Sequence, residues 1–353
     1  MFTSVRVRNF RAITDLHVDG LSRVNLFVGH NACGKTTFLE SVFLLIGATN
    51  PRLPLNINAF RGFPYMSSTL WSTYFRNLDD TIPIEISAVE SETGEHHVRI
   101  VPRYEGASAD LATRESVGSF DNVPSDSDVS AAANGLRLEY VDPANPDAKI
   151  VSEVRLKGTE VEVRRGAENR PRPLRGSFVM ALPSDLRDRL SEVQRKKRVQ
   201  EVVHLLRGIE PTLMDLRIGD PQGWLYADTG APELIPVNLM GGGMVKFLST
   251  ALTMLDLQDG FVLIDEIENG LDSTSMGKVW NAIFDWAQKL NVQVFASTHS
   301  RECIRAFSDC AETNLFGSEA KLFRIERAAE RFRAVEYTRE LLAESLESEW
   351  EVR

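Results

Sequence analysis

The sequence predicts an α/β fold built around a parallel sheet, and three segments carry this prediction. Residues 26–46 contain an apolar run, a glycine-rich loop and an apolar pattern with helical spacing. Residues 261–266 form a second apolar run that ends in two carboxylates, and residues 292–299 form a third that ends in a histidine. Short apolar runs separated by helix-sized connections are typical of buried parallel strands. We therefore expect a parallel core sheet with flanking helices.

The glycine-rich loop follows the pattern G-x-x-x-x-G-K-T between a strand-like run and a helical pattern. Glycines let the backbone turn tightly, so that its N–H groups point at phosphate oxygens. The helix start adds partial positive charge, Lys35 can reach the β- and γ-phosphates, and the Thr36 hydroxyl can ligate Mg²⁺. This context separates the motif from a chance glycine-rich turn. The sequence therefore predicts a nucleoside triphosphate site with these lining residues: Gly29, Asn31, Gly34, Lys35, Thr36 and Thr37.

The composition is that of an ordinary globular protein, and its 353 residues suffice for one large domain or two. No run of about 18 apolar residues is present, and residues 1–8 alternate like a strand rather than a signal peptide. Cys33, Cys303 and Cys310 have no metal or disulfide spacing, as expected in the reducing cytoplasm. The formal net charge of −10 argues against a broad nucleic-acid-binding surface, so any such contact requires a local basic patch.

In the first hundred residues, strands are expected at 4–8, 16–18, 23–28, 82–89 and 97–101. An aromatic segment lies between them, and we favour a core role for it over a base-stacking platform. Its members are Phe60, Phe63, Tyr65, Trp71, Tyr74 and Phe75. His96 and His97 have no third ligand at metal spacing, so a solvated pair at a strand end is favoured over a metal site.

The middle of the chain changes composition. Residues 105–135 are rich in Ser, Ala, Asp, Gly and Asn, which predicts a long loop or mobile insertion. Strand alternation resumes over 136–180, and a helix is expected from Ser184 to Gly208. This region holds the main basic concentration of an acidic chain: Arg164, Arg165, Arg170, Arg172, Arg175, Arg195, Lys196, Lys197 and Arg198. A solvated helix face is the favoured interpretation, and a nucleic-acid or partner contact is the alternative.

The run at 261–264 ends in Asp265 and Glu266. Downstream of a phosphate-binding loop, the first carboxylate can hold Mg²⁺ and the second can polarise the water that attacks the γ-phosphate. The next apolar run ends in His299 after one helix-sized connection. This position would let His299 contact the γ-phosphate. Glu266, His299 and Lys35 are therefore the predicted catalytic residues, and Thr36 and Asp265 the predicted metal ligands.

These segments, in this order, resemble the ATP-binding-cassette (ABC) ATPases. The resemblance includes a glycine cluster, Gly241, Gly242 and Gly243, ahead of the Asp-Glu strand. In that family this signature segment of one subunit closes over the ATP bound by another, and ATP and Mg²⁺ are the cofactors. Gly241 replaces the family's serine, so backbone N–H groups would meet the γ-phosphate. The family's loop glutamine is also missing, since Gln194 is the first glutamine in the chain. Asn77, Asp79 and Asp80 are its candidate substitutes.

A closer resemblance is to stand-alone ABC-type AAA ATPases of prokaryotes, related to the ATPase half of OLD (overcoming lysogenisation defect) nucleases. The matching segments are 9–11, 265–272, 298–300 with 302–304, and 336–353. Relatives in this group dimerise head to tail on ATP. Several, such as the AriA ATPase of PARIS, hold or release a separately encoded toxin or nuclease in anti-phage defence. The resemblance implies that Arg11 lies near the nucleotide and that Asp272 belongs to a loop crossing the dimer interface.

The resemblance and the sequence patterns together imply a cytoplasmic ABC-type ATPase head, with a mixed β lobe beside the parallel core sheet. It would have three parts: 1–104 with the phosphate loop, an inserted β/helical subdomain at 105–235, and 236–353 with the other motifs. OLD nucleases carry a further nuclease domain, for which residues 300–353 are too few. We therefore favour a slow ATPase that forms a homodimer or larger oligomer and regulates a separate toxin or nuclease effector, without membrane contact. The main alternative is a RecF-like or SMC-like DNA-maintenance ATPase contacting DNA through 164–198, although residues 180–210 lack sustained heptads. An ABC transporter subunit and a non-hydrolysing ATP-binding module are further alternatives.

Overall fold

The computed structural model describes residues 1–63, 68–104, 133–157, 160–165, 174–179, 186–219, 223–338, 341–342 and 344. The strands of this part of the chain form three sheets, of seven, six and three strands. The loop predicted at 105–135 lies almost wholly outside the described residues, as do Tyr65 and much of the arginine-rich segment before residue 174.

The six-stranded sheet is the core, and its strand order is β16-β15-β3-β14-β13-β9. Its members are β3 (Val24–Val28), β9 (Gly176–Val179), β13 (Phe261–Ile264), β14 (Gln293–Ser297), β15 (Ala320–Ala328) and β16 (Arg331–Tyr337). All neighbouring pairs are parallel except β15 and β16. The parallel core sheet predicted from the three apolar runs is confirmed.

The seven-stranded sheet is antiparallel throughout, with the order β2-β1-β4-β5-β6-β7-β8. It contains β1 (Phe2–Phe10), β2 (Ile13–Asp19), β4 (Ile84–Glu90), β5 (Gly94–Tyr104), β6 (Ala133–Asp142), β7 (Asn145–Lys157) and β8 (Glu160–Arg164). The strands of the expected insertion thus continue the N-terminal sheet, and β9 joins the core sheet. The domain boundaries at 104 and 235 remain a prediction.

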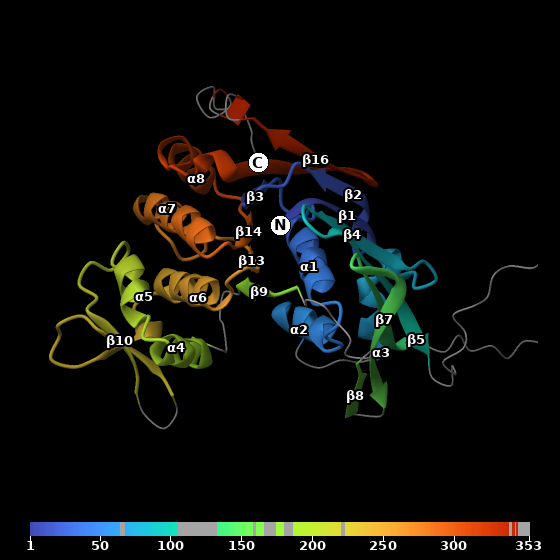
Figure 1. Ribbon diagram of the computed structural model, residues 1–353, viewed down its shortest axis with the longest axis horizontal. Helices are drawn as coiled ribbons and strands as arrows, with labels where there is room; N and C mark the ends of the chain where they lie inside the picture. The colour runs from blue at the N-terminus through green and yellow to red at the C-terminus, as the bar shows by residue number, and fades with distance from the viewer. Residues whose placement is uncertain are drawn as a thin grey trace, which may run out of the picture.

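Side-chain alternation along the core strands separates two hydrophobic cores. Phe27 of β3 packs with Phe295 and Phe323 on the face covered by α1 (Lys35–Ile46) and the antiparallel sheet. Leu26 and Val28, its neighbours on β3, face the opposite core. Three helices cover that side: α6 (Gly242–Asp256), α7 (Ser273–Lys289) and α8 (Arg301–Thr313). Figure 1 shows α6, α7 and α8 on one side of the core strands and α1 on the other.

Smaller elements complete the described chain. They are α2 (Leu53–Phe60), α3 (Ser68–Trp71), α4 (Leu186–Arg195), α5 (Val199–Leu206), β10 (Asp215–Ile218), β11 (Leu225–Asp228) and β12 (Ile235–Pro236). Four single 3₁₀ turns accompany them at Ser72–Tyr74, Arg76–Leu78, Val237–Leu239 and Gly317–Glu319.

The single helix expected from Ser184 to Gly208 was wrong, because the structure has α4 and α5 with a break between them. Lys197 adopts a left-handed conformation with φ 57° at the break. The Lys197 N–H donates to the Gln194 carbonyl and the Arg198 N–H to the Val193 carbonyl, which is the pattern of a Schellman motif. The sequence did not indicate this helix end, because the left-handed residue of such a motif is usually glycine and here it is Lys197.

The aromatic segment is mainly core, as expected: Trp71, Tyr74 and Phe75 are buried, while Phe63 is exposed. The expectation of a solvated histidine pair was wrong for His96. Its side chain is buried, with Nδ1 hydrogen-bonded to the Tyr140 hydroxyl and Nε2 to the Glu90 carboxylate. Among the described residues, no group of three or more His, Cys, Asp or Glu side chains could hold a metal ion.

Candidate functional site

The glycine-rich loop joins the end of β3 to the start of α1. Gly29 has φ 144° and leaves no room for a side chain, because a Cβ there would lie 2.5 Å from the Ile325 carbonyl oxygen. The buried Lys35 side chain folds back over the loop, and its Nζ donates to the carbonyl oxygens of Gly29 (2.7 Å) and His30 (3.1 Å). An ammonium group is thereby held within the glycine-rich loop, where it could neutralise the oxygens of a bound phosphate. Asn31 is exposed on this loop, and Thr37 is buried behind it.

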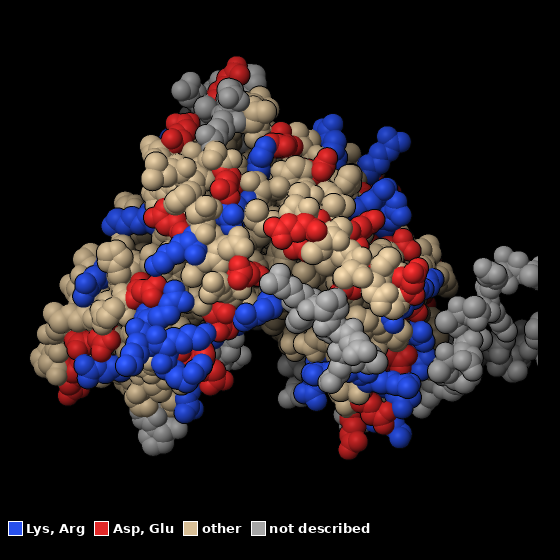
Figure 2. Space-filling model, viewed as in Figure 1, with Lys and Arg blue, Asp and Glu red and all other residues tan. Residues whose placement is uncertain are grey.

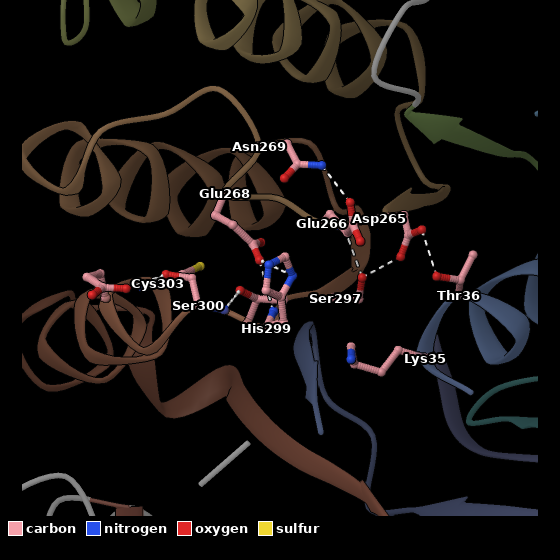
Figure 3. Close-up of polar contacts among 12 residues, drawn as sticks. Lys35, Thr36, Asp265, Glu266, Glu268, Asn269, Ser297, His299, Ser300 and Cys303 are labelled. Atoms are coloured by element: carbon pink, nitrogen blue, oxygen red, sulfur yellow. Dashed lines mark hydrogen bonds and ion pairs between the residues drawn. The ribbon is translucent and has the colours of Figure 1, made fainter. Parts of the chain in front are cut away.

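The predicted metal ligands meet directly, although they are far apart in the sequence. The Thr36 hydroxyl on α1 donates to Oδ2 of Asp265, which follows β13, at 2.8 Å. Hydroxyl and carboxylate oxygens are hard ligands that suit Mg²⁺, which is usually held by one or two protein groups plus substrate phosphates. Thr36 and Asp265 therefore fit a magnesium ion bound together with a triphosphate. Figure 3 shows them facing each other above Lys35.

Ser297 completes this arrangement, and the sequence analysis had not singled it out. It is the last residue of β14, which lies next to β13 in the sheet. Its hydroxyl donates to Oδ1 of Asp265 and accepts the N–H of Glu266 at 2.9 Å. The only sequence signal was its place at the end of a core strand, at the sheet edge where ligands bind in parallel α/β folds.

Glu266 has an unusual backbone conformation, and its carboxylate is hydrogen-bonded. Its φ of 47° lies in the left-handed region, which costs a non-glycine residue about 1–3 kcal/mol and is common at functional sites. Among the described residues, the carboxylate is contacted by the side chain of Asn269 alone, whose Nδ2 donates to Glu266 Oε2 at 2.6 Å. A carboxylate so placed beside Asp265 can accept a proton from a water attacking a bound γ-phosphate.

His299 lies two residues beyond Ser297, but its ring is engaged elsewhere. Both its backbone N–H and its Nδ1 lie 2.9 Å from Glu268 Oε1. The Glu268 carboxylate is 10% exposed, whereas the His299 side chain is 46% exposed. Glu268 thus fixes the histidine at the rim of the site (Figure 3). Its contact with a γ-phosphate remains a prediction.

The glycine cluster begins α6, with Gly241 as its N-cap and φ 99°. A Cβ on Gly241 or Gly242 would meet nothing within 4 Å, whereas one on Gly243 would lie 2.0 Å from the Gly270 carbonyl oxygen. Gly241 and Gly242 are therefore open to an approaching molecule, and Gly243 is packed against the loop that follows Glu266. Contact of this cluster with a nucleotide remains a prediction.

We predict that Gly243→Ala lowers the free energy of unfolding by about 1–3 kcal/mol, because the methyl group would overlap the Gly270 backbone. Gly242→Ala is the matched control. It should be neutral or slightly stabilising, because the site is open and alanine favours a helix. Chemical denaturation of both variants checks this, and equal stability of the two would contradict the packing described.

Arg11 lies beside α1 in a buried cluster of charges. Its Nε is 3.1 Å from Glu40 Oε2, and Nη2 donates to Asn58 Oδ1 at 3.0 Å. The same Glu40 carboxylate accepts two hydrogen bonds from Arg61, at 2.6 and 3.0 Å. Burial lowers the pKa of Arg11, although the negative charge of Glu40 acts in the opposite direction. Glu40 follows Thr36 by one helical turn, so two guanidinium groups share one carboxylate close to the metal ligands.

Arg61 extends this positive charge toward Asp265. Burial alone would lower its pKa, but the hydrogen bonds to Glu40 and the negative charges of Glu40 and Asp265 raise it above the ordinary value. Sequence reasoning missed both Glu40 and Arg61 and considered Asn77, Asp79 and Asp80 as substitutes for the missing glutamine. In the structure Asp79 accepts hydrogen bonds from the backbone and hydroxyl of Thr81, and the choice among the three remains a prediction.

Asp272 is the N-cap of α7. Its carboxylate accepts from the backbone N–H groups of Thr274 (2.9 Å) and Ser275 (3.0 Å) and from both hydroxyls. These hydrogen bonds hold the pKa of Asp272 far below its usual range, and those from the two hydroxyl groups have the largest effect. The residue thus has a structural role in this chain, and its place at a dimer interface remains a prediction.

The chain is similar to a family of ATPase domains and to solved structures of SMC heads. The AAA ATPase domain family matches residues 1–112, which include the glycine-rich loop. An SMC head domain derived from Pyrococcus furiosus, solved with the C-terminal domain of ScpA, aligns over 98% of both chains with a TM-score of 0.51 and 10% identity. The chain has the fold of a P-loop ATPase head. An SMC head bound to the C-terminal winged-helix domain of ScpA aligns over 96% of this ATPase head and 97% of its own chain, with a TM-score of 0.49 and 11% identity.

A curated protein of Helicobacter pylori (strain ATCC 700392 / 26695) carries the name "ATP/GTP phosphatase". It is 21% identical to the ATPase head over 345 residues, which is 92% of each chain. The domain match and this relative support an enzyme that hydrolyses a nucleoside triphosphate. No helix in the described part of the chain has the length and apolarity required to span a bilayer.

Proposed function

We propose that this ATPase head binds ATP with Mg²⁺ and hydrolyses it slowly through Glu266. The observation that carries the proposal is the convergence of Thr36 and Asp265 at 2.8 Å, next to Lys35 and Glu266. In the proposed mechanism, Lys35 neutralises the β- and γ-phosphates, while Thr36 and Asp265 hold the metal. Glu266 accepts the proton of the attacking water. Slow turnover follows from Gly241 in place of a signature serine and from the missing loop glutamine.

We further propose that ATP joins two copies head to tail. Gly241 and Gly242 of one copy would then meet the γ-phosphate held by the other. The position of the two glycines supports this contact, since both are exposed at the start of a 15-residue helix. Such a helix end presents free N–H groups and partial positive charge to an anion. A second copy would thus supply the part of the site that one chain lacks.

The proposed biological role is regulation of a separately encoded toxin or nuclease in cytoplasmic anti-phage defence. It rests on the resemblance of residues 265–272 and 298–304 to stand-alone ATPases of that kind. The test is co-purification of the full chain, at native expression level, with the product of a neighbouring gene, in the presence of ATP and Mg²⁺. A stoichiometric effector that leaves when ATP is hydrolysed is expected, and purification without any such protein would contradict the role.

A DNA-maintenance ATPase is the second candidate, favoured by the basic side chains over α4 and α5 in Figure 2. Several of these charges are already paired. Arg195 and Lys196 contact Glu192, and Arg198 contacts Glu201. This candidate predicts ATP-dependent and salt-dependent binding of duplex DNA that is lost on charge reversal at 195–198. The defence role predicts no such binding.

A further inference from the structure

A buried lysine on α6 lies outside the site described so far. Lys246 is 3% exposed, and its Nζ donates to the carbonyl oxygen of Asp265 at 2.7 Å and to that of Glu266. Burying an ammonium group is costly unless it is hydrogen-bonded or paired. Burial lowers the pKa of Lys246, while the nearby carboxylates, Glu268 first, act to raise it. The chain therefore retains a costly cation whose partners are the backbones of the two residues that carry the proposed chemistry.

The peptide group that joins Asp265 to Glu266 is held from both ends. Lys246 binds its carbonyl oxygen, and the Ser297 hydroxyl accepts its N–H at 2.9 Å. The next carbonyl, that of Glu266 itself, is also bound by Lys246. Because the backbone of Glu266 is in the left-handed region, these contacts stabilise a conformation that the residue would not adopt alone. They fix the direction in which the Glu266 side chain leaves the backbone.

The same helix contacts the other end of this loop. Gly243 packs so closely on Gly270 that no side chain would fit between them. Gly243 and Lys246 are three residues apart and so lie on one face of α6. The start of α6 therefore holds residues 265–270 at both ends, whereas Gly241 and Gly242, just before these contacts, are open to a second molecule.

We propose that Lys246 is a positioning residue that couples the glycine cluster of a subunit to Glu266 of the same subunit. When Gly241 and Gly242 dock on the nucleotide of a second copy, α6 sets the backbone at 265–266 and so places Glu266 for hydrolysis in its own site. The inference rests on the proposed head-to-tail dimer. It makes ATP hydrolysis cooperative, because each site is completed only when the other holds ATP.

The test compares Lys246→Met, Lys246→Arg and Ser297→Ala in the full chain, with Mg-ATP as the probe. Lys246→Met keeps the length of the side chain and removes its charge. It is expected to lower kcat by about 10- to 100-fold, since small misplacements of a catalytic group cost rates of this order. The Kd for ATP should stay within about threefold, because Lys246 does not touch the nucleotide loop. The Hill coefficient for ATP should fall from above 1 to 1.

Lys246→Arg, which can still donate to both carbonyls, should recover part of kcat and of the cooperativity. Ser297→Ala is the matched control. It should lower kcat, because it removes the hydrogen bond from the Glu266 N–H to the Ser297 hydroxyl. The Hill coefficient should nevertheless stay above 1. Wild-type kcat and cooperativity in Lys246→Met, or loss of cooperativity in Ser297→Ala alone, would overturn the coupling. The dimer is tested separately by sedimentation of Glu266→Gln with ATP, and its absence would overturn both the dimer and the coupling.

Discussion

Replacing Glu266 by glutamine is expected to lower ATP turnover by about 10²–10³-fold, as loss of a general base does. Glutamine has nearly the same shape and can keep the contact with Asn269, but it cannot accept a proton from water. ATP should still bind, because Lys35, Thr36 and Asp265 are unchanged. The variant should therefore accumulate as an ATP-bound dimer. Phosphate release and light scattering after size exclusion measure both effects.

Glu268→Gln is the control for this experiment. Glu268 lies two residues further along the chain and holds His299 rather than facing Asp265. Its replacement should cost about tenfold or less, through a less ordered histidine. Normal turnover in Glu266→Gln, with large loss in Glu268→Gln, would mean that the base has been assigned to the wrong carboxylate.

Lys35→Ala is expected to weaken ATP binding by about 10- to 150-fold. This factor corresponds to about 1.5–3 kcal/mol, the usual contribution of a hydrogen bond to a charged group. The substitution also removes the contacts that draw Gly29 and His30 around the ammonium group, so the loop loses a cation and part of its shape. Isothermal titration calorimetry with Mg-ATP measures the change.

Lys149→Ala provides the matched control for Lys35→Ala. Its side chain is 61% exposed on β7, where it contacts Glu139 at 3.5 Å. Removing it changes the net charge of the chain by the same amount but leaves the glycine-rich loop intact. ATP affinity should be unchanged. An equal loss of affinity in the two variants would indicate a general effect of charge, and wild-type affinity in Lys35→Ala would show that this lysine does not bind phosphate.

The parts of the site that the sequence predicted are those carried by short motifs. Gly29, Lys35 and Thr36 lie on one continuous segment, the glycine-rich loop and the first turn of α1, so their spacing alone fixes their geometry. Asp265 and Glu266 could be placed because a buried strand ends just before them, and ends of parallel strands share one sheet edge. The contact between Thr36 and Asp265 confirms that these two segments meet.

The parts that the sequence did not predict depend on which strands and helices become neighbours. Ser297 reaches Asp265 only because β14 lies next to β13. Lys246 reaches the Asp265 carbonyl only because α6 packs against the loop that follows β13. The buried state of His96 likewise depends on Tyr140, which comes from the adjoining strand β6. Strand order is not encoded in hydrophobic periodicity, so these contacts required the three-dimensional structure.

The most direct test of the account is a crystal structure of Glu266→Gln with ATP and Mg²⁺. The account predicts the triphosphate in the loop at 29–34, Lys35 on the β- and γ-phosphates, and Mg²⁺ between Thr36 and Asp265. Gly241 and Gly242 of a second copy should lie on the γ-phosphate. A triphosphate bound away from Asp265, or one whose γ-phosphate meets no second copy, would contradict it.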